Sequence, residues 1–249
     1  MKSFIKIVAV FVILLVKLSV SYSQSFKWVN FGKSEGFDYG NDISTDDSGN
    51  VYIAGQFEFT AKFGNVTLVS AGQHDIFVAK YNSQGDLIWI RSAGGSDGDA
   101  GSAIALDPSG NVYVTGEFET TCKFSPTDSI TSSGNNDIFL AKYNNNGIFQ
   151  WVKKFGGTGD NRGRAIAVDA SGNSYISGSF SSTVNFGGQN LTSSGGNDIF
   201  LAKYNSSGTR QWSIRAGGTK DDRGRDITLD GFGNLYLTTS YTQSANFSG

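Results

Sequence analysis

The sequence contains few of the residues that build cross-links and metal sites. Its 249 residues include one cysteine, one histidine, one methionine and two prolines. A single cysteine excludes an internal disulfide and a cysteine-based zinc site, and a single histidine excludes any site that needs two imidazoles. The scarcity of proline excludes collagen and proline-rich linkers. No metal and no cofactor are therefore expected.

Charge is also scarce, and the two signs nearly balance. Charged residues make up 17% of the chain and the formal net charge is −2, which gives no basic footprint for nucleic acid. Apolar residues reach 38%, enough for a core. Glycine is the abundant residue, at 33 positions against a usual share of about 7%. The chain is long enough for one large domain or two small ones.

Residues 1–23 have the layout of a secretory signal peptide. Lys2 and Lys6 precede a ten-residue apolar run over 7–16, and the small residues Ser21 and Ser23 follow at the −3 and −1 positions before Gln24. A membrane-spanning helix needs about 20 apolar residues, so we expect cleavage, no remaining span, and a secreted or cell-surface protein. An uncleaved anchor is the alternative.

The rest of the chain repeats with a period of 61 to 62 residues. The segment DIFVAKYN at 75–82 returns as DIFLAKYN at 137–144 and 198–205. A D-x-x-G-N turn and a tryptophan recur with the same spacing. The turns begin at Asp46, Asp107, Asp169 and Asp230, and the tryptophans are Trp28, Trp89, Trp151 and Trp212. Three independent motifs with one period indicate a repeat protein.

Each repeat contains four short runs rich in β-branched and aromatic residues, bounded by turn residues. In the second repeat these runs are 103–106, 112–118, 138–143 and 149–153. The pattern predicts an all-β fold, a β-propeller over residues 24–249 with four-stranded blades of about 61 residues. Repeats begin near residues 40, 101, 163 and 224, which gives three full blades and a partial fourth. A solenoid or a stacked sandwich is the alternative.

These motifs resemble the bacterial β-propeller repeat family known as SBBP. The second repeat reads AIALDPSGNVYVTG from Ala103 and DIFLAKYNNNG from Asp137, followed by Trp151 and the pair Gly156–Gly157. The resemblance covers nearly all of the chain after residue 23. It implies an exported or surface propeller of the Bacteroidetes type, without catalytic residues.

The fourth repeat stops inside the long loop that follows its second strand. We expect the chain to be the front part of a longer propeller. A short four-bladed ring completed by the Trp28 segment, or a ring completed by a second chain, is the alternative. An open edge of unpaired backbone groups favours self-association.

Loops that enter the first strand of each repeat are the candidate ligand site, because they would surround one mouth of the central channel. Arginine forks and carboxylates there could bind a glycan or an anionic peptide. Mutual pairing as a solvated salt-bridge set is the competing interpretation. The candidate residues are Asp99, Asp160, Arg162, Arg164, Asp222, Arg223 and Arg225.

Other reactive residues have plainer interpretations. The repeated aspartates of the D-x-x-G-N turns are expected to fix those turns, and Asp75, Asp137 and Asp198 to fix the start of the third strand. Lys80, Lys142 and Lys203 are expected to lie along the strand with solvated ammonium groups. Cys122 falls at a core position and His74 in a turn.

The sequence favours a non-enzymatic exported module that binds or scaffolds a polysaccharide or surface protein. The alternative is an enzyme, because the segment 82–89 is loosely similar to the tryptophan-docking motif of quinone-dependent dehydrogenase propellers. Two positions of that motif, a threonine before the glycine and the opening aspartate, are missing.

Overall fold

The computed structural model describes residues 33–244 and 246, which form β-strands and no helix. The predicted all-β class is confirmed. Among these residues no helix is long and apolar enough to cross a membrane. The predicted signal peptide at 1–23 and the Trp28 segment lie outside the described residues, and so do residues 247–249.

Each of the first three repeats contributes four main antiparallel strands to a sheet, and the fourth repeat contributes two. Added strands make the first sheet five-stranded and the second six-stranded, and β8 and β9 form a further two-stranded sheet. The first sheet contains β2 (Tyr39–Thr45), β3 (Val51–Phe63), β4 (Val66–Tyr81) and β5 (Leu87–Ala93), with β1 (Lys33–Ser34) paired to β3. The second contains β6 (Asp99–Leu106), β7 (Val112–Phe118), β10 (Asp137–Tyr143) and β11 (Phe149–Gly157). The third contains β12 (Arg162–Val168), β13 (Ser174–Phe180), β16 (Asp198–Tyr204) and β17 (Arg210–Ala216), and the fourth β18 (Arg223–Leu229) and β19 (Leu235–Ser240).

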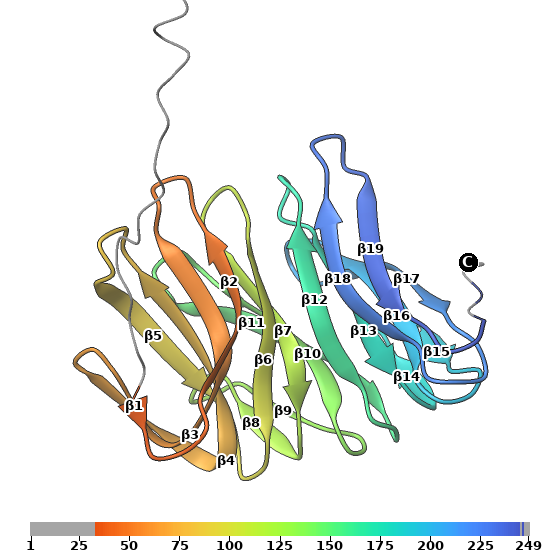
Figure 1. Ribbon diagram of the computed structural model, residues 1–249, viewed down its shortest axis with the longest axis horizontal. Coiled ribbons are helices and arrows are strands. Elements are labelled where there is room, and N and C mark those ends of the chain that lie inside the picture. Colours follow the sequence, from red (N-terminus) through yellow and green to blue (C-terminus); the bar gives the residue numbers. More distant parts are fainter. Residues whose placement is uncertain (1–32, 245, 247–249) are drawn as a thin grey trace, which may run out of the picture.

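The first strand of each repeat contacts the first strand of the next. β6 lies against β2 and β12, and β12 lies against β18. Figure 1 shows the four sheets side by side in chain order, from orange through green to blue. The first strands therefore form an inner row, as a propeller requires. Closure of this row into a ring stays a prediction.

The long loop of the second repeat contains a short hairpin of β8 (Thr121–Lys123) and β9 (Ser129–Thr131), and the third has its counterpart in β14 (Thr183–Asn185) and β15 (Asn190–Thr192). These hairpins join consecutive sheets. Gly156 and Gly157 of β11 pair with Asn185 and Val184 of β14, which extends β11 four residues beyond its predicted end at residue 153. Gly94 and Gly217 of the equivalent glycine pairs each form a single bridge, to Lys123 and Asn246.

Tryptophan, tyrosine and lysine stack at each repeat. Trp89 meets Tyr52 edge to face with ring centroids 6.2 Å apart, and Lys80 Nζ lies 4.9 Å above the Tyr52 ring. The same trio recurs in the second and third sheets. The expected solvated head is wrong for Lys80, which is 6% exposed. Asn145 of the next repeat explains this burial, because its side chain accepts hydrogen bonds from the Lys80 ammonium and the Tyr52 hydroxyl.

The turn-fixing role of the repeated aspartates is confirmed. Asp107 Oδ1 accepts from the backbone N–H groups of Ser109 and Asn111, and Oδ2 accepts from Asn111 Nδ2 at 2.7 Å. Asp46, Asp169 and Asp230 make the same bonds. These carboxylates are engaged by their own turns.

Replacing Gly147 by alanine tests the contact between sheets. Gly147 has φ +70°, and a Cβ there would lie 2.6 Å from Cδ2 of Trp89 in the preceding sheet. We expect Gly147→Ala to lower the free energy of unfolding by about 2–4 kcal/mol, from left-handed strain and overpacking together. Gly49→Ala is the control, since Gly49 has φ +75° but its Cβ would be 3.4 Å from its nearest neighbour. Urea titration of both variants gives the comparison, and equal losses would contradict the packing role of Trp89.

Candidate functional site

A β-bulge interrupts the inner strand of every repeat at the same position. The pairing skips one residue after Gly40, Gly101, Gly163 and Gly224 in turn. The skipped residues are Asn41, Ser102, Arg164 and Arg225. A bulge places an extra residue outside the regular ladder and re-aims its side chain. The geometry is therefore repeated four times while the side chain it presents changes.

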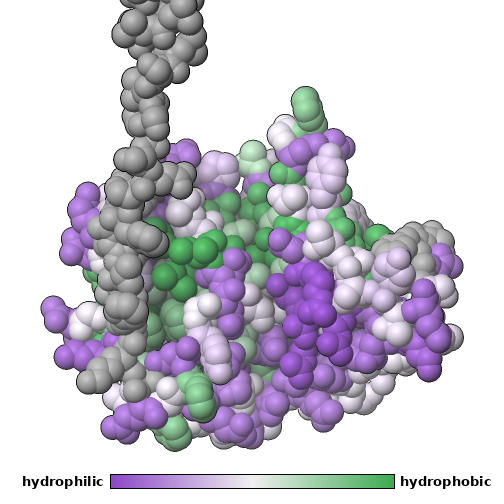
Figure 2. Space-filling view, in the orientation of Figure 1, coloured by the Kyte–Doolittle hydropathy of each residue, from purple (hydrophilic) through white to green (hydrophobic). Residues whose placement is uncertain are grey.

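All four bulged residues line one cavity of about 320 Å³, which we call the inner pocket. Its other lining residues are Gln56 of β3, Glu117 of β7 and Ala100 of β6. Gln56 and Glu117 are equivalent residues of the first two repeats. Gln56 follows Gly55, which pairs with Gly40, and Glu117 follows Gly116, which pairs with Gly101. In Figure 2 a strongly hydrophilic patch covers the region where Figure 1 places β12 and β18, the strands that carry the two arginines.

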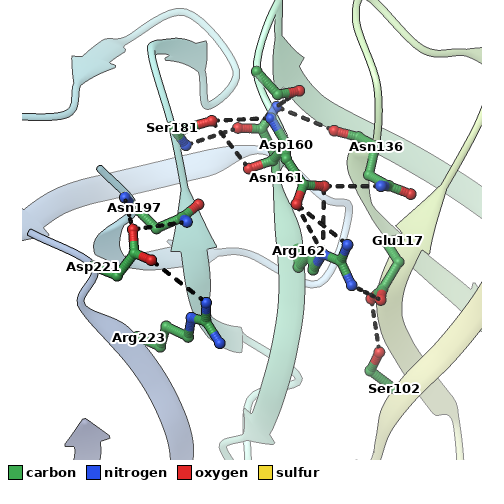
Figure 3. Close-up of polar contacts among 11 residues, drawn as sticks. Ser102, Glu117, Asn136, Asp160, Asn161, Arg162, Ser181, Asn197, Asp221 and Arg223 are labelled. Atoms are coloured by element: carbon green, nitrogen blue, oxygen red, sulfur yellow. Dashed lines mark hydrogen bonds and ion pairs between the residues drawn. The ribbon is translucent and has the colours of Figure 1, made fainter. Parts of the chain in front are cut away.

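Arg162 sits at the rim of the pocket between two carboxylates (Figure 3). Its Nη2 lies 3.2 Å from Asp160 Oδ2, and its Nη1 lies 3.6 Å from Glu117 Oε1. Ser102 donates to Glu117 Oε2 at 3.0 Å. Burial raises the pKa of Glu117, and the bond from Ser102 and the nearby charges of Arg162 and Arg164 oppose that rise. Arg223 pairs in the same way with Asp221, at 3.7 Å.

Arg164 and Arg225 carry the unneutralised charge of the site. Among the described residues neither has a carboxylate within 4.0 Å. Arg164 Nε is buried and has no hydrogen-bond partner there, while Arg225 Nε donates to Ser240 Oγ at 3.0 Å. Burial lowers the pKa of Arg164, the charge of Glu117 opposes this, and the positive charges of Arg162, Arg223 and Arg225 lower the pKa further. The inner pocket is consequently a polar cavity with excess positive charge.

Asp99 and Asp222 do not face this pocket. Both side chains are fully buried. Asp99 accepts from the Gly95 N–H at 2.8 Å, and Asp222 accepts from the N–H groups of Gly218 and Thr242. They hold the loops that enter β6 and β18, whereas Asn161 fills the equivalent place in the third repeat.

The predicted site residues thus separate into three groups. Arg164 and Arg225 line the pocket, Asp160, Arg162 and Arg223 form ion pairs at the rim, and Asp99 and Asp222 lie behind it. Sequence reasoning missed Asn41 and Ser102, although aligning the repeats places them beside Arg164 and Arg225. It also missed Gln56 and Glu117, which only the strand pairing brings to the pocket.

Cys122 occupies the core position that the sequence predicted. Its side chain is fully buried, and burial raises the pKa of the thiol. Asp137 and Asp198 open β10 and β16, are buried, and each accept a backbone N–H from the preceding loop, as expected. The expected strand start is wrong for Asp75, which is buried inside β4 and accepts the N–H of Ala71 in the same strand, because β4 extends back to Val66.

Comparison with known proteins supports the resemblance of the repeat. The family model for the beta-propeller repeat (SBBP) matches residues 88–117. That segment runs from the tryptophan strand of the first sheet through the bulge to Glu117 in the second sheet. An all-β chain of antiparallel sheets with this repeat is consistent with the predicted propeller.

Two known proteins are similar over longer stretches. The regulatory protein FlaEY of Caulobacter vibrioides is 28% identical over 167 residues, which is 64% of this chain. The uncharacterized WD repeat-containing protein L264 of Acanthamoeba polyphaga mimivirus is 26% identical over 242 residues, or 77% of this chain. The chain spans 17% of the length of each relative. The second relative is named for its WD repeats, which agrees with the repeat architecture of this chain.

Asp99 and Asp75 form a buried acidic pair without a cation. One oxygen of each carboxylate is buried without a nitrogen or oxygen donor among the described residues, and the Cys122 thiol hydrogen-bonds to Asp99. Ser92 stands opposite Phe77, whereas the equivalent positions hold Lys154, 3.9 Å from Asp137, and Arg215, 2.9 Å from Asp198. Burial raises the pKa of Asp99 to about 7, helped by the charge of Asp75, and burial raises the pKa of Asp75 to about 6.

The contribution of this pair to the stability of the protein should therefore fall as the pH rises. Both folded-state pKa values exceed the unfolded value of about 4, so the stabilisation is complete below pH 4 and is lost as the pH passes 6 to 7. Asp99→Asn copies Asn161 and should raise the free energy of unfolding at pH 8 by about 1–3 kcal/mol, with little gain at pH 4.

Chemical denaturation at pH 4, 6 and 8 measures this effect. Asp97→Asn is the control, because its carboxylate is partly exposed and its hydrogen bonds to Ser96 and Thr120 lower its pKa. A gain for Asp99→Asn that is independent of pH would contradict the buried-pair interpretation.

Proposed function

We propose that the protein is a non-enzymatic, exported binding module in which the repeats are blades of a β-propeller. Its inner pocket holds an acidic group of a surface glycan or protein partner. The observation that carries the proposal is the bulge shared by all four inner strands. Residues that hold the fold recur from repeat to repeat, but the bulge presents asparagine, serine, arginine and arginine.

Charge in the pocket supports an anionic partner. Arg164 and Arg225 lie on adjacent inner strands, and among the described residues neither has a carboxylate within 4.0 Å. Arginine forks bind carboxylates and phosphates in pairs of parallel hydrogen bonds. Arg162 and Arg223 at the rim already have carboxylate partners. Arg164 and Arg225 are therefore the arginines available to a ligand.

We propose export because residues 1–23 have the layout of a signal peptide. We propose the absence of catalysis because of the residues that line the pocket. The single carboxylate that lines it, Glu117, is occupied by Ser102 and lies near Arg162. General acid–base chemistry on a sugar commonly uses two carboxylates that flank the bond. We therefore propose binding without turnover.

Binding to a panel of defined acidic and neutral polysaccharides and peptides tests this function. The full chain should bind at least one acidic member with saturation, and Arg164→Ser with Arg225→Ser should weaken that binding by at least about tenfold, about 1.4 kcal/mol. Serine is the residue of the second repeat at this bulge, so the double variant keeps a side chain that the fold already accepts.

Arg210→Gln is the matched control, because Arg210 of β17 contacts Gln189 and Gly187 in the turn between β14 and β15, and none of the three lines the pocket. Cell fractionation followed by detection with an antibody tests the proposed export, which predicts the protein outside the cell or on its surface. Unchanged affinity in the double variant would move the binding site elsewhere, and release of a cleaved or oxidised product would identify an enzyme.

A further inference from the structure

We infer that the inner pocket takes an acidic sugar residue, a ring that carries one carboxylate and neighbouring hydroxyl groups. The inference rests on the proposed binding function and names the ligand class of that same pocket. Three features of the pocket lead to it: the two arginines of the third and fourth sheets, Glu117 of the second sheet, and the amide groups of the first sheet.

Arg164 and Arg225 define where the negative charge of the ligand sits. They occupy the same bulge position on β12 and β18, which lie side by side. The buried Nε of Arg164 has no partner among the described residues. An anion between the two guanidinium groups relieves their mutual repulsion and supplies acceptors in fork geometry.

Glu117 requires hydrogen-bond donors from the ligand. It lines the same cavity from β7, and one of its oxygens already accepts from Ser102. A second carboxylate placed against it would be repelled, so the ligand has to turn its charge to the arginines and its donors to Glu117. A sulfate dianion supplies charge but no hydroxyl donor, and a phosphate dianion supplies a single hydroxyl, fewer than a sugar ring.

Neutral amides complete the lining. Asn41 donates its Nδ2 to the Gly101 carbonyl at 3.0 Å, which leaves its Oδ1 as an acceptor, and Gln56 offers both a donor and an acceptor. Hydroxyl groups satisfy such mixed partners. An aspartate or glutamate side chain would place methylene groups there, and polar groups left unpaired on binding reduce affinity.

Size agrees with a single sugar ring. The cavity of about 320 Å³ is at the small end of the range for ligand pockets, about 300–1,000 Å³. Its walls come from the inner strands and their neighbours in the first two sheets together with the bulged arginines of β12 and β18. One acidic residue of a polysaccharide can enter while the rest of the chain remains outside.

Binding of D-glucuronate and D-glucose to the full chain tests the inference, because the two sugars differ only in the carboxylate. Ligand-observed NMR or calorimetry at pH 7 should show glucuronate binding at least about tenfold more tightly. Arg164→Ser and Arg225→Ser should each remove most of that preference, and Arg210→Gln should leave it unchanged. Circular dichroism and a thermal melt check that each variant is folded.

Glu117→Gln separates charge recognition from hydroxyl recognition. The variant should bind glucuronate more weakly and acetate no more weakly than the wild type, since acetate has no hydroxyl to lose. Equal affinity of the wild type for glucuronate, acetate and inorganic phosphate would overturn the sugar assignment. Tighter binding of a glutamate-rich peptide than of glucuronate would also overturn it and assign the pocket to a protein partner.

Failure of this inference and failure of the proposed function give different results. If the polysaccharide and peptide panel shows binding that depends on Arg164 and Arg225 while glucuronate does not bind, only the ligand class is wrong. If no ligand on the panel depends on these arginines, the proposed function fails as well.

Discussion

Each sheet depends on its neighbour to bury its faces. One apolar cluster joins the first and second sheets around Tyr52, Trp89 and Phe139, and another joins the second and third around Tyr113, Phe180 and Phe200. A single repeat could not bury these rings alone, which is the general condition of repeat proteins. Asn145 shows how specific the dependence is, because this one side chain of the second repeat serves both Lys80 and Tyr52 of the first. The inner row of strands, and with it the inner pocket, exists only because the sheets are stacked.

Much of this architecture was predictable from local sequence. Strand positions, turns and the apolar core follow from motifs that repeat every 61 to 62 residues, since the alternation of side chains and the hydrogen bonds of D-x-x-G-N turns are local properties. Asp107 and Cys122 were placed correctly for that reason. Lys80 was not, because its environment is supplied by Asn145 from another repeat.

The candidate site was only partly predictable. A comparison of the repeats indicated Arg164 and Arg225, because the equivalent position holds a different residue type in the first two repeats. Nothing in the pattern shows that this position is a bulge, because a bulge is defined by the pairing of two strands. Glu117 belongs to a strand whose local pattern indicates only a sheet, and it reaches the pocket through that pairing. Asp99 and Asp222 were grouped with the arginines by sequence proximity, but alternate side chains of an extended segment point to opposite sides.

The bulge also bears on how such a protein changes over generations. Its residue stands outside the ladder, so replacing it leaves the paired backbone of the inner strand intact. Substitutions there should therefore change the free energy of unfolding little, while they change the chemistry of the pocket directly. Duplication of a repeat copies the bulge with the fold, and each copy adds one more position at which new recognition can arise by a single codon change.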